Sequence, residues 1–297
     1  MSFDVIVVGH VAIDVNVFPW GVIENVLGGA PTYSGLTFVN LKRSVGISSK
    51  VGLDFLEKFP PIYGKLGLDT AGIIVAGEHT TTFQNIYDES GRRTQICKHM
   101  APRIIPEDIP EEYMEAAGFY VSPIANEVGP ELLQYLKKNS NLVMLDPQGI
   151  LREIAIDGKV SVKSRDLGQY LKHVDVVKLG MDEAAVLGSN PEESMEKIMK
   201  AGPGVVILTK GGAPSFVMSK TGLTKVNPLK VVAKDMTGAG DVFGAAFLHR
   251  FMATRDAVDA AKFGTAAAGL KIRFRGPVGF SNEKEIEDAA KTITVDQ

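Results

Sequence analysis

The chain has few of the features that mark secreted, membrane or nucleic-acid-binding proteins. Cys97 is its single cysteine, so no disulfide can form within it, as in proteins of a reducing compartment. No apolar run reaches the roughly 18–20 residues that a membrane helix needs, and residues 1–4 lack the basic start of a signal peptide. The formal net charge is −3, without the basic excess typical of nucleic-acid binding. We therefore expect a cytoplasmic protein with neither a membrane nor a nucleic-acid partner.

The motifs of several enzyme classes are also missing. The sequence contains no G-x-x-x-x-G-K-[ST], which argues against a P-loop kinase. Gly9 stands alone after the first apolar stretch, without the G-x-G-x-x-G of dinucleotide-binding folds. There is no G-x-S-x-G or H-E-x-x-H, and the histidines show no metal-ligand spacing.

Short apolar stretches alternate with helical patterns along most of the chain. Strand-like runs occur at residues 5–8, 45–51, 72–75, 118–121, 142–145, 174–178 and 205–209. Helical patterns lie between several of them, including one at 127–138. This alternation predicts a parallel sheet. We therefore predict an α/β fold, a mainly parallel sheet with helices on both faces, in a single domain over residues 1–297.

Two pairs of strand-like segments interrupt the alternation. Residues 80–87 and 94–99 flank the turn-forming cluster 88–91. A hairpin of this kind does not fit easily within a parallel core, so we expect a small β lid from residues 80–99 together with 15–27. A solvated hairpin without ligand contact is the alternative. A second hairpin, at 215–226, is expected to wall the nucleotide side.

The run Asp235-Met-Thr237-Gly238-Ala239-Gly240-Asp241 carries the clearest chemistry. It follows a strand-like stretch at 231–235 and opens a helical pattern. Glycines at a helix N-terminus leave backbone N–H groups free for an oxyanion or a transferring phosphoryl group. A carboxylate at the same place would repel bound negative charge, so Asp241 is suited to proton abstraction. Together these features indicate phosphoryl transfer; the alternative is a structural glycine turn in which Asp241 stabilises the helix dipole.

With D-M-T-G-A-G-D at 235–241, the chain resembles the ribokinase superfamily, the PfkB-type carbohydrate kinases, whose signature is D-T-x-G-A-G-D. Further matching segments in the order of that family are Gly28-Gly29-Ala30-Pro31, Val51-Gly52-Leu53-Asp54 and the strand end at 206–212. The resemblance implies that Asp241 is the catalytic base. It also implies that the N–H groups of Gly238, Ala239 and Gly240 form the anion hole.

The resemblance extends to the nucleotide and metal. The N-x-x-E of the family reads Gly180-Met-Asp-Glu183 here, so Glu183 is expected to hold Mg²⁺ through water, although the Asn is missing. The backbone and side chains of a strand end and of the glycine turn can meet the phosphates of ATP. The residues expected in this role are Thr209, Lys210, Gly212 and Thr237.

The acceptor site is expected around Asp14, because ligands of open α/β sheets bind at the carboxyl ends of strands. A carboxylate there can accept hydrogen bonds from two hydroxyls, while a turn-capping role is the alternative. Gly28 and Gly29 would let the backbone approach the substrate closely. Tyr33 stands where many family members have a sugar-contacting Asn. Asp146 and Arg152 could help to orient phosphates or substrate, or they could cap a strand end.

These residues predict transfer of the γ-phosphoryl group of ATP to a hydroxyl of a small polyol. Only thirteen residues separate Asp14 from Gly28, which leaves little room for a large lid and is similar to the inositol-kinase branch. A cyclitol such as myo-inositol is therefore the first expectation, with a nucleoside as the alternative. A non-catalytic metabolite sensor is the alternative of another class. A homodimer through the lid hairpin is left open.

Overall fold

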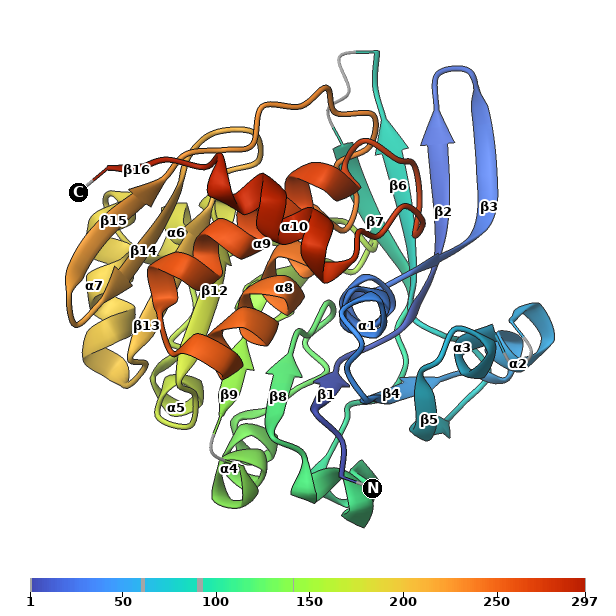
Figure 1. Cartoon of the computed structure of the whole chain (residues 1–297). Coiled ribbons are helices and arrows are strands. Elements are labelled where there is room, and N and C mark those ends of the chain that lie inside the picture. Colours follow the sequence, from blue (N-terminus) through green and yellow to red (C-terminus); the bar gives the residue numbers. More distant parts are fainter. Residues whose placement is uncertain (1, 60–61, 90–92, 141, 297) are drawn as a thin grey trace.

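A single large sheet organises the molecule (Figure 1). The computed structural model describes residues 2–59, 62–89, 93–140 and 142–296. From edge to edge the strands are β16 (Val295–Asp296), β15 (Gly222–Val226), β14 (Ser215–Ser219), β13 (Val205–Thr209), β12 (Val176–Gly180), β9 (Val143–Leu145), β8 (Gly118–Val121), β1 (Val5–Val8), β4 (Val45–Val51) and β5 (Asp69–Val75). Neighbours from β13 to β5 pair in parallel, whereas β14 to β16 pair antiparallel. The predicted mainly parallel sheet is confirmed.

Helices cover both faces of this sheet, which explains why β1 is the unbroken apolar run Val-Ile-Val-Val with every side chain buried. Val5 and Val7 contribute to one core, and Ile6 and Val8 to the other. The first core packs under α1 (Ala30–Asn40), α8 (Ala239–Thr254), α9 (Ala257–Lys271) and α10 (Glu283–Lys291). The second packs under α4 (Pro130–Asn139), α5 (Gly168–Leu171), α6 (Met181–Leu187) and α7 (Pro191–Ala201). The short helices α2 (Leu53–Lys58) and α3 (Ile62–Lys65) lie beside β5.

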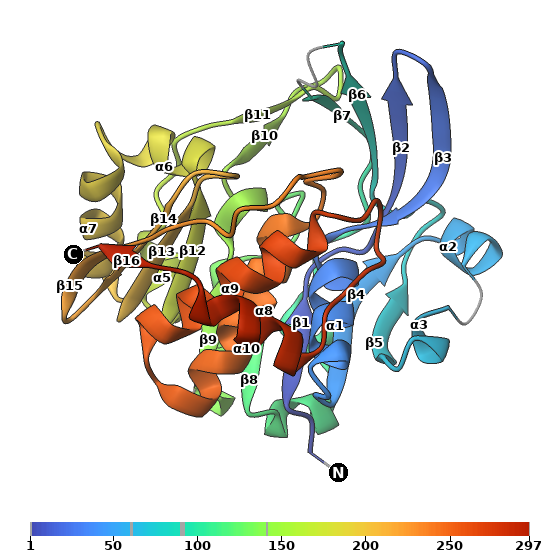
Figure 2. The ribbon, with the colours of Figure 1, turned by 45° about the horizontal axis from the view of Figure 1, so that its top comes forward.

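A second, four-stranded sheet stands at one end of the main sheet (Figure 2). Its order is β3 (Gly21–Gly28), β2 (Ala12–Phe18), β6 (Thr82–Tyr87) and β7 (Arg93–His99). The hairpin of β10 (Arg152–Ile154) and β11 (Val160–Val162) meets β7 through a bridge between Ile96 and Lys159. Both segments expected to form a lid therefore belong to one small sheet, which we call the lid sheet. Residues 90 and 91 of the predicted turn, and Arg92, lie outside the described residues.

Two sequence-based boundaries were wrong. Residues 231–235 form no strand; Val232 is 85% exposed, so no core draws this segment into the sheet. The backbone N–H groups of Lys234 and Asp235 donate instead to the Ile272 carbonyl at the end of α9, at 2.7 and 3.1 Å. The helix expected from residue 127 begins at Pro130, because the buried Glu127 carboxylate accepts from the backbone N–H groups of His10, Ile124 and Ala125. A carboxylate used in this way holds a loop rather than the first turn of a helix.

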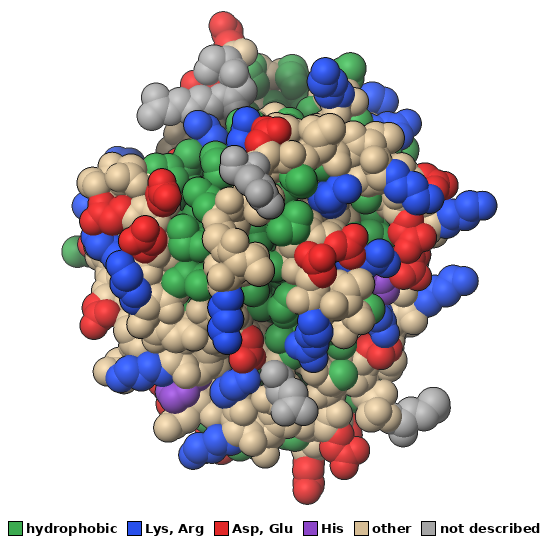
Figure 3. Space-filling model, turned by 60° about the vertical axis from the view of Figure 1, so that its left-hand side comes forward, with side chains coloured by type: hydrophobic (Ala, Val, Ile, Leu, Met, Phe, Trp, Pro, Cys, Tyr) green, Lys and Arg blue, Asp and Glu red, His purple; other side chains and the backbone are tan. Residues whose placement is uncertain are grey.

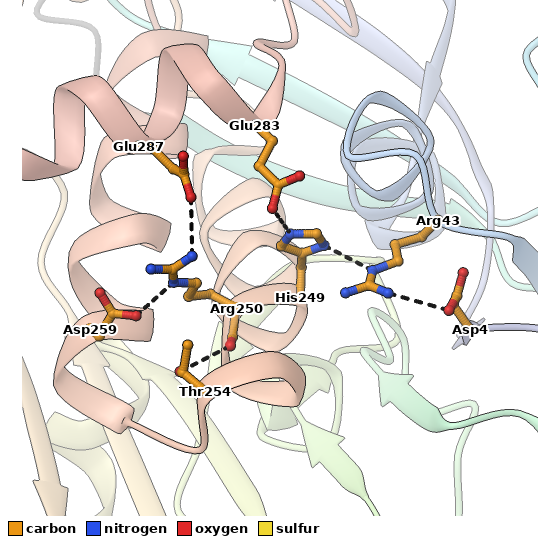
Figure 4. A network of polar contacts seen from close by, with 8 residues as sticks. All are labelled: Asp4, Arg43, His249, Arg250, Thr254, Asp259, Glu283 and Glu287. Carbon is orange, nitrogen blue, oxygen red and sulfur yellow. Dashed lines mark hydrogen bonds and ion pairs between the residues drawn. The ribbon is translucent and has the colours of Figure 1, made fainter.

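A polar network around the buried His249 joins three helices to β1 (Figure 4). His249 of α8 accepts from Arg43 Nε at its Nδ1 (3.0 Å), and its Nε2 lies 3.1 Å from Glu283 of α10. Arg43 follows α1 and donates to Asp4, which precedes β1. The ring of His249 stacks on Phe263 of α9, with centroids 5.6 Å apart. The network therefore fixes α8 and α10 relative to α1 and the start of the sheet.

Charges of both signs are mixed on one face of the molecule. Figure 3 shows the face that carries the antiparallel edge of the sheet, where Lys and Arg side chains are interspersed with Asp and Glu. None of the described helices is long and apolar enough to cross a bilayer.

Candidate functional site

The glycine turn stands at the N-terminus of α8. Gly238 has φ 73°, and a Cβ there would overlap the ring of Tyr33. Only glycine meets both requirements, a left-handed backbone and no side chain. Ala239 and Gly240 form the first turn of α8, where backbone N–H groups lack partners within the helix and the helix dipole is positive. The turn is therefore built to receive negative charge.

Asp241 lies at the same helix end and lacks the usual partners of a carboxylate. Its Oδ1 atom is enclosed and has no hydrogen-bond partner among the described residues. Burial, and next the charge of Asp146, raise the pKa of Asp241 to about 7, although Lys178 and Arg152 act in the opposite direction. Enclosed polar atoms are normally hydrogen-bonded, so this oxygen awaits a ligand donor. A pKa near 7 suits a general base.

Lys178 is the cation beneath this turn, and the sequence analysis missed it. Its Nζ pairs with Asp146 Oδ2 at 2.5 Å, and the two side chains are 5% and 3% exposed. A Cβ at Gly240 would lie 3.4 Å from that Nζ. Burial opposes the charge, but Asp146, and then Asp241 and Glu183, raise the pKa of Lys178 overall. The one available signal was a lysine inside the otherwise apolar strand Val-Val-Lys-Leu-Gly of β12.

Glu183 projects from the first turn of α6 toward the same group of charges. Burial, and next the charge of Asp146, raise its pKa. A Cβ at Gly180 would overlap Glu183 Oε2, so the glycine that replaces the Asn of the family makes room for this carboxylate. Among the described residues no three His, Cys, Asp or Glu side chains are grouped to hold a metal. One carboxylate fits Mg²⁺ that is held mainly by water and substrate phosphates.

Asp14 marks the lid side of the site, on β2. Its Oδ1 is enclosed and has no partner in the described part of the chain, and burial raises its pKa to about 6. A Cβ at Gly28 would overlap Asp14 Oδ2, and one at Gly29, which has φ 84°, would overlap the His10 carbonyl. The two glycines therefore let β3 pass close to Asp14 and turn at once into α1. Like Asp241, Asp14 presents an oxygen that a ligand hydroxyl can satisfy.

Tyr33 lies between these two carboxylates. It is buried on α1 with its ring against Gly238, and Lys271 Nζ lies 5.7 Å from the ring centroid. Burial raises the pKa of the Tyr33 hydroxyl far above its usual value, and Asp235, Asp241 and Asp14 add to the shift. The neutral phenol can donate a hydrogen bond to a ligand that lies between the two carboxylates.

A cleft opens on the other side of the glycine turn. Thr209, Lys210 and Gly212 line it at the end of β13, together with Ala239 and Gly240. Its other walls are apolar, and the wall formed by α9 carries small residues. These walls are lined by Leu229, Met236, Phe243, Ala268, Gly269 and Ile272. Ser215 Oγ and Thr265 Oγ1 lie in these walls, enclosed and without partners among the described residues. An apolar slot with a few unsatisfied hydroxyls fits a flat heterocycle with a polar edge.

Thr237 is the predicted nucleotide residue that does not line this cleft. Its backbone N–H donates to Asp235 Oδ1 at 2.9 Å, and the other Asp235 oxygen accepts from Gly276 at 2.8 Å. These bonds hold the loop in front of the glycine turn. The structure therefore gives Thr237 and Asp235 a role in shaping the turn.

Arg152 connects the site to the lid sheet. Its guanidinium donates to the Ile124 carbonyl (2.8 Å) and to Gln148 Oε1 (3.1 Å), and lies 5.6 Å from the ring centroid of Phe83 on β6. Burial, and next the charge of Arg93, lower its pKa. Asp146 both caps the following turn, accepting from Gln148 N–H, and pairs with Lys178. The strand-end cap and the charged site thus use the same carboxylate.

This group of residues is suited to a phosphotransferase that acts on an alcohol group. The sequence profile of the pfkB family carbohydrate kinase matches residues 2–284, so the chain belongs to that family. A cytidine kinase of Thermococcus kodakarensis is 27% identical over 89% of this chain and 94% of its own. An inositol 3-kinase of Arabidopsis thaliana is 25% identical over 93% of this chain and 76% of its own.

Solved structures support the same fold. A pyrophosphate-dependent kinase of the ribokinase family, complexed with a pyrophosphate analog and myo-inositol, has a TM-score of 0.83 at 22% identity and covers 96% of this chain and 99% of its own. The ribokinase of Thermotoga maritima has a TM-score of 0.79 at 21% identity and covers 98% and 100%. The predicted ribokinase-like fold is confirmed.

Proposed function

We propose that the protein transfers the γ-phosphoryl group of ATP to a hydroxyl of a small polyol. One observation carries the proposal: Asp241, with an enclosed and unpartnered oxygen and a raised pKa, lies at the N-terminal glycine turn of α8. A base and a set of anion-binding N–H groups are then adjacent, as in-line phosphoryl transfer requires.

Different residues act on the proton of the attacking hydroxyl and on the charge of the phosphoryl group. Asp241 removes the proton of the attacking hydroxyl. The N–H groups of Gly238, Ala239 and Gly240 stabilise the charge that develops on the phosphoryl oxygens. Lys178, close beneath Gly240, offsets the negative charge of Asp146, Asp241 and Glu183. Without this lysine, three carboxylates would face an incoming phosphate.

The donor is proposed to occupy the cleft beside the turn. Its adenine would fill the apolar slot, and its phosphates would lie near Thr209, Lys210 and Gly212. Mg²⁺ bound to the phosphates would neutralise part of their charge, with Glu183 as its water-mediated partner. An Escherichia coli protein described as a putative ribokinase II in complex with ATP and Mg²⁺ shares the fold at 20% identity.

The acceptor is proposed to lie between Asp14 and Asp241, beside Gly28, Gly29 and Tyr33. Two enclosed carboxylate oxygens without partners among the described residues call for a ligand with several hydroxyls. A cyclitol such as myo-inositol meets this requirement, and inositol 3-kinases are among the relatives. A nucleoside meets it too, and a cytidine kinase is among them. Both acceptors offer neighbouring hydroxyls to Asp14.

An acceptor and donor panel tests this proposal. Purified protein is incubated with Mg²⁺ and with ATP or pyrophosphate, alone and with myo-inositol, ribose, fructose, adenosine or cytidine, and the phosphorylated product is measured. We expect phosphorylated acceptor when ATP is the donor. If the protein binds ATP but phosphorylates none of the acceptors, the metabolite sensor is favoured. Product formed with pyrophosphate but not with ATP would overturn the donor assignment.

A further inference from the structure

One face of the lid sheet is directed into the site. Alternate residues of a strand share a face, so the face that carries Asp14 also carries Asn16 and Phe18 of β2. The neighbouring strand β6 adds Phe83, Asn85 and Tyr87, and β7 adds Gln95, which is paired with Asn85 in register. Phe83 is buried under the Arg152 guanidinium. Tyr87 is close enough to Tyr33 to add to the rise in its pKa that burial mainly causes.

A row of amides crosses this face just beyond Asp14. Asn85 Nδ2 donates to Asn16 Oδ1 at 3.0 Å, and Gln95 Nε2 donates to Asn85 Oδ1 at 2.9 Å. Each amide at the end of the row keeps further hydrogen-bonding capacity, because a carboxamide has two donors and an acceptor. Such a row can pair with a ligand edge on which donors and acceptors alternate.

Three aromatic rings follow beyond the amides. Phe18 stacks on Tyr87 with centroids 4.9 Å apart and planes at 10°, and on Trp20 at 4.8 Å and 5°. Trp20 is 68% exposed. Parallel rings at the open end of a polar site provide flat, polarisable surfaces on which another planar ring can stack.

The spacing distinguishes between acceptors. Asp14 and Phe18 are four residues apart along β2, or roughly 13 Å in an extended strand. A cyclitol held by Asp14 is much shorter than this. It could contact Asn85, which lies within hydrogen-bonding reach of Asp14, but it would leave the rings unused. A sugar joined to a planar base would span the distance, with the base next to the rings.

We propose, on the basis of the proposed function, that the acceptor is a nucleoside. Asp14 binds the hydroxyls of its sugar, and the hydroxymethyl group opposite the base is directed to Asp241. The base stacks against the Phe18–Tyr87 pair, while Asn16 and Gln95 bind its edge. The lid sheet is then the element that selects the acceptor.

Trp20, the single tryptophan of the chain, reports base binding without any catalysis. Wild-type protein without donor is titrated with cytidine, adenosine, ribose and myo-inositol, and its fluorescence is followed. We expect a saturable change with at least one nucleoside, and binding at least about tenfold weaker for ribose, the usual scale of base–aromatic stacking. Myo-inositol or ribose binding as tightly as the nucleosides would overturn the inference.

Variants of the aromatic residues test where the nucleobase of the acceptor binds. Tyr87→Ala is expected to lower nucleoside kcat/KM by at least about tenfold, while Tyr87→Phe retains most of it and ribose kcat/KM is little changed. Val22→Ala, an exposed position of β3, is the matched control and should be neutral. Equal losses for ribose and nucleoside in Tyr87→Ala, or no loss for either, would contradict stacking. If no acceptor is phosphorylated at all, the kinase proposal fails, and the Trp20 titration still decides whether a base binds.

Discussion

At the scale of the residue, the site depends on two carboxylates, each with one oxygen that has no hydrogen-bond partner among the described residues. Asp241 and Asp14 each have an enclosed oxygen and a raised pKa, to about 7 and about 6. An enclosed oxygen without a hydrogen-bond partner lowers the stability of the folded protein, so selection for stability alone does not explain these two carboxylates. Their arrangement makes sense when substrate hydroxyls complete their hydrogen bonds.

Lys178 offers a test of this electrostatic arrangement. Because the lysine lowers the pKa of Asp241, Lys178→Met should raise that pKa and move the acidic limb of kcat against pH upward from its wild-type midpoint near 7. Lys178→Arg should keep the limb near its wild-type position, and Lys291→Met, a surface change on α10, serves as the control. An unchanged midpoint in Lys178→Met, with only a lower plateau, would show that Lys178 does not act on the base.

The sequence could place Asp241, the glycine turn and Asp14 in the candidate site. The first two belong to a short motif, and Asp14 follows the end of a predicted strand. It could not predict Lys178, whose role depends on Asp146 approaching from a different strand. The amide row of the lid was hidden for the same reason: Asn16, Asn85 and Gln95 become neighbours only when β2 pairs with β6 and β6 with β7.

At the scale of the element, the sequence predicted the buried strands and both hairpins, but it assigned a strand to one exposed segment that has none. Runs such as 5–8 and 205–209 are strands because helices cover both their faces. Residues 231–233 are also apolar but have no covering layer, and Val232 stays exposed. Local pattern decides a strand only when tertiary burial agrees with it.

The His249 network predicts how the helices depend on pH. Burial mainly lowers the pKa of His249 below 6.5, and Arg43 and Arg250 oppose its protonation, whereas Glu283 favours it. The folded state therefore prefers neutral His249, so its contribution to stability is complete above about pH 6.5 and is lost as pH falls below that value. Chemical denaturation from pH 8 to 5 should show wild type losing stability in this window.

His249→Phe separates this residue from the other titrating groups. The ring can still stack on Phe263, but the variant should lose roughly 1–3 kcal/mol at pH 8, because Arg43 and Glu283 lose a partner. Its further loss between pH 7 and 5 should be smaller than that of wild type. Parallel curves for the two proteins would show that His249 is not the titrating group.

At the scale of the whole molecule, the proposed acceptor site lies between the lid sheet and the main sheet. Water must be excluded during transfer, or ATP would be hydrolysed without an acceptor. We therefore predict that acceptor and ATP together slow hydrogen exchange of the β6 and β7 amides, whereas β1, already buried, is unchanged. Exchange in β6 and β7 that is indifferent to both ligands would mean that closure comes from elsewhere.

The outer face of the lid sheet bears on assembly. Val15, Val17 and Ile86 are only half-buried there, and sheets with exposed apolar faces often pair with another chain. A homodimer through the lid hairpin, which the sequence left open, stays untested, and sedimentation velocity at several protein concentrations would check it.

The central claim is that Asp241 is the base of a kinase, and its substitution tests that claim most directly. Asp241→Asn is compared with wild type and with Asp288→Asn, a surface carboxylate on α10, by measuring kcat and the acceptor Kd. We expect kcat to fall by about two or more decades, with Kd nearly unchanged and Asp288→Asn equal to wild type. Near-normal turnover by Asp241→Asn would contradict the account.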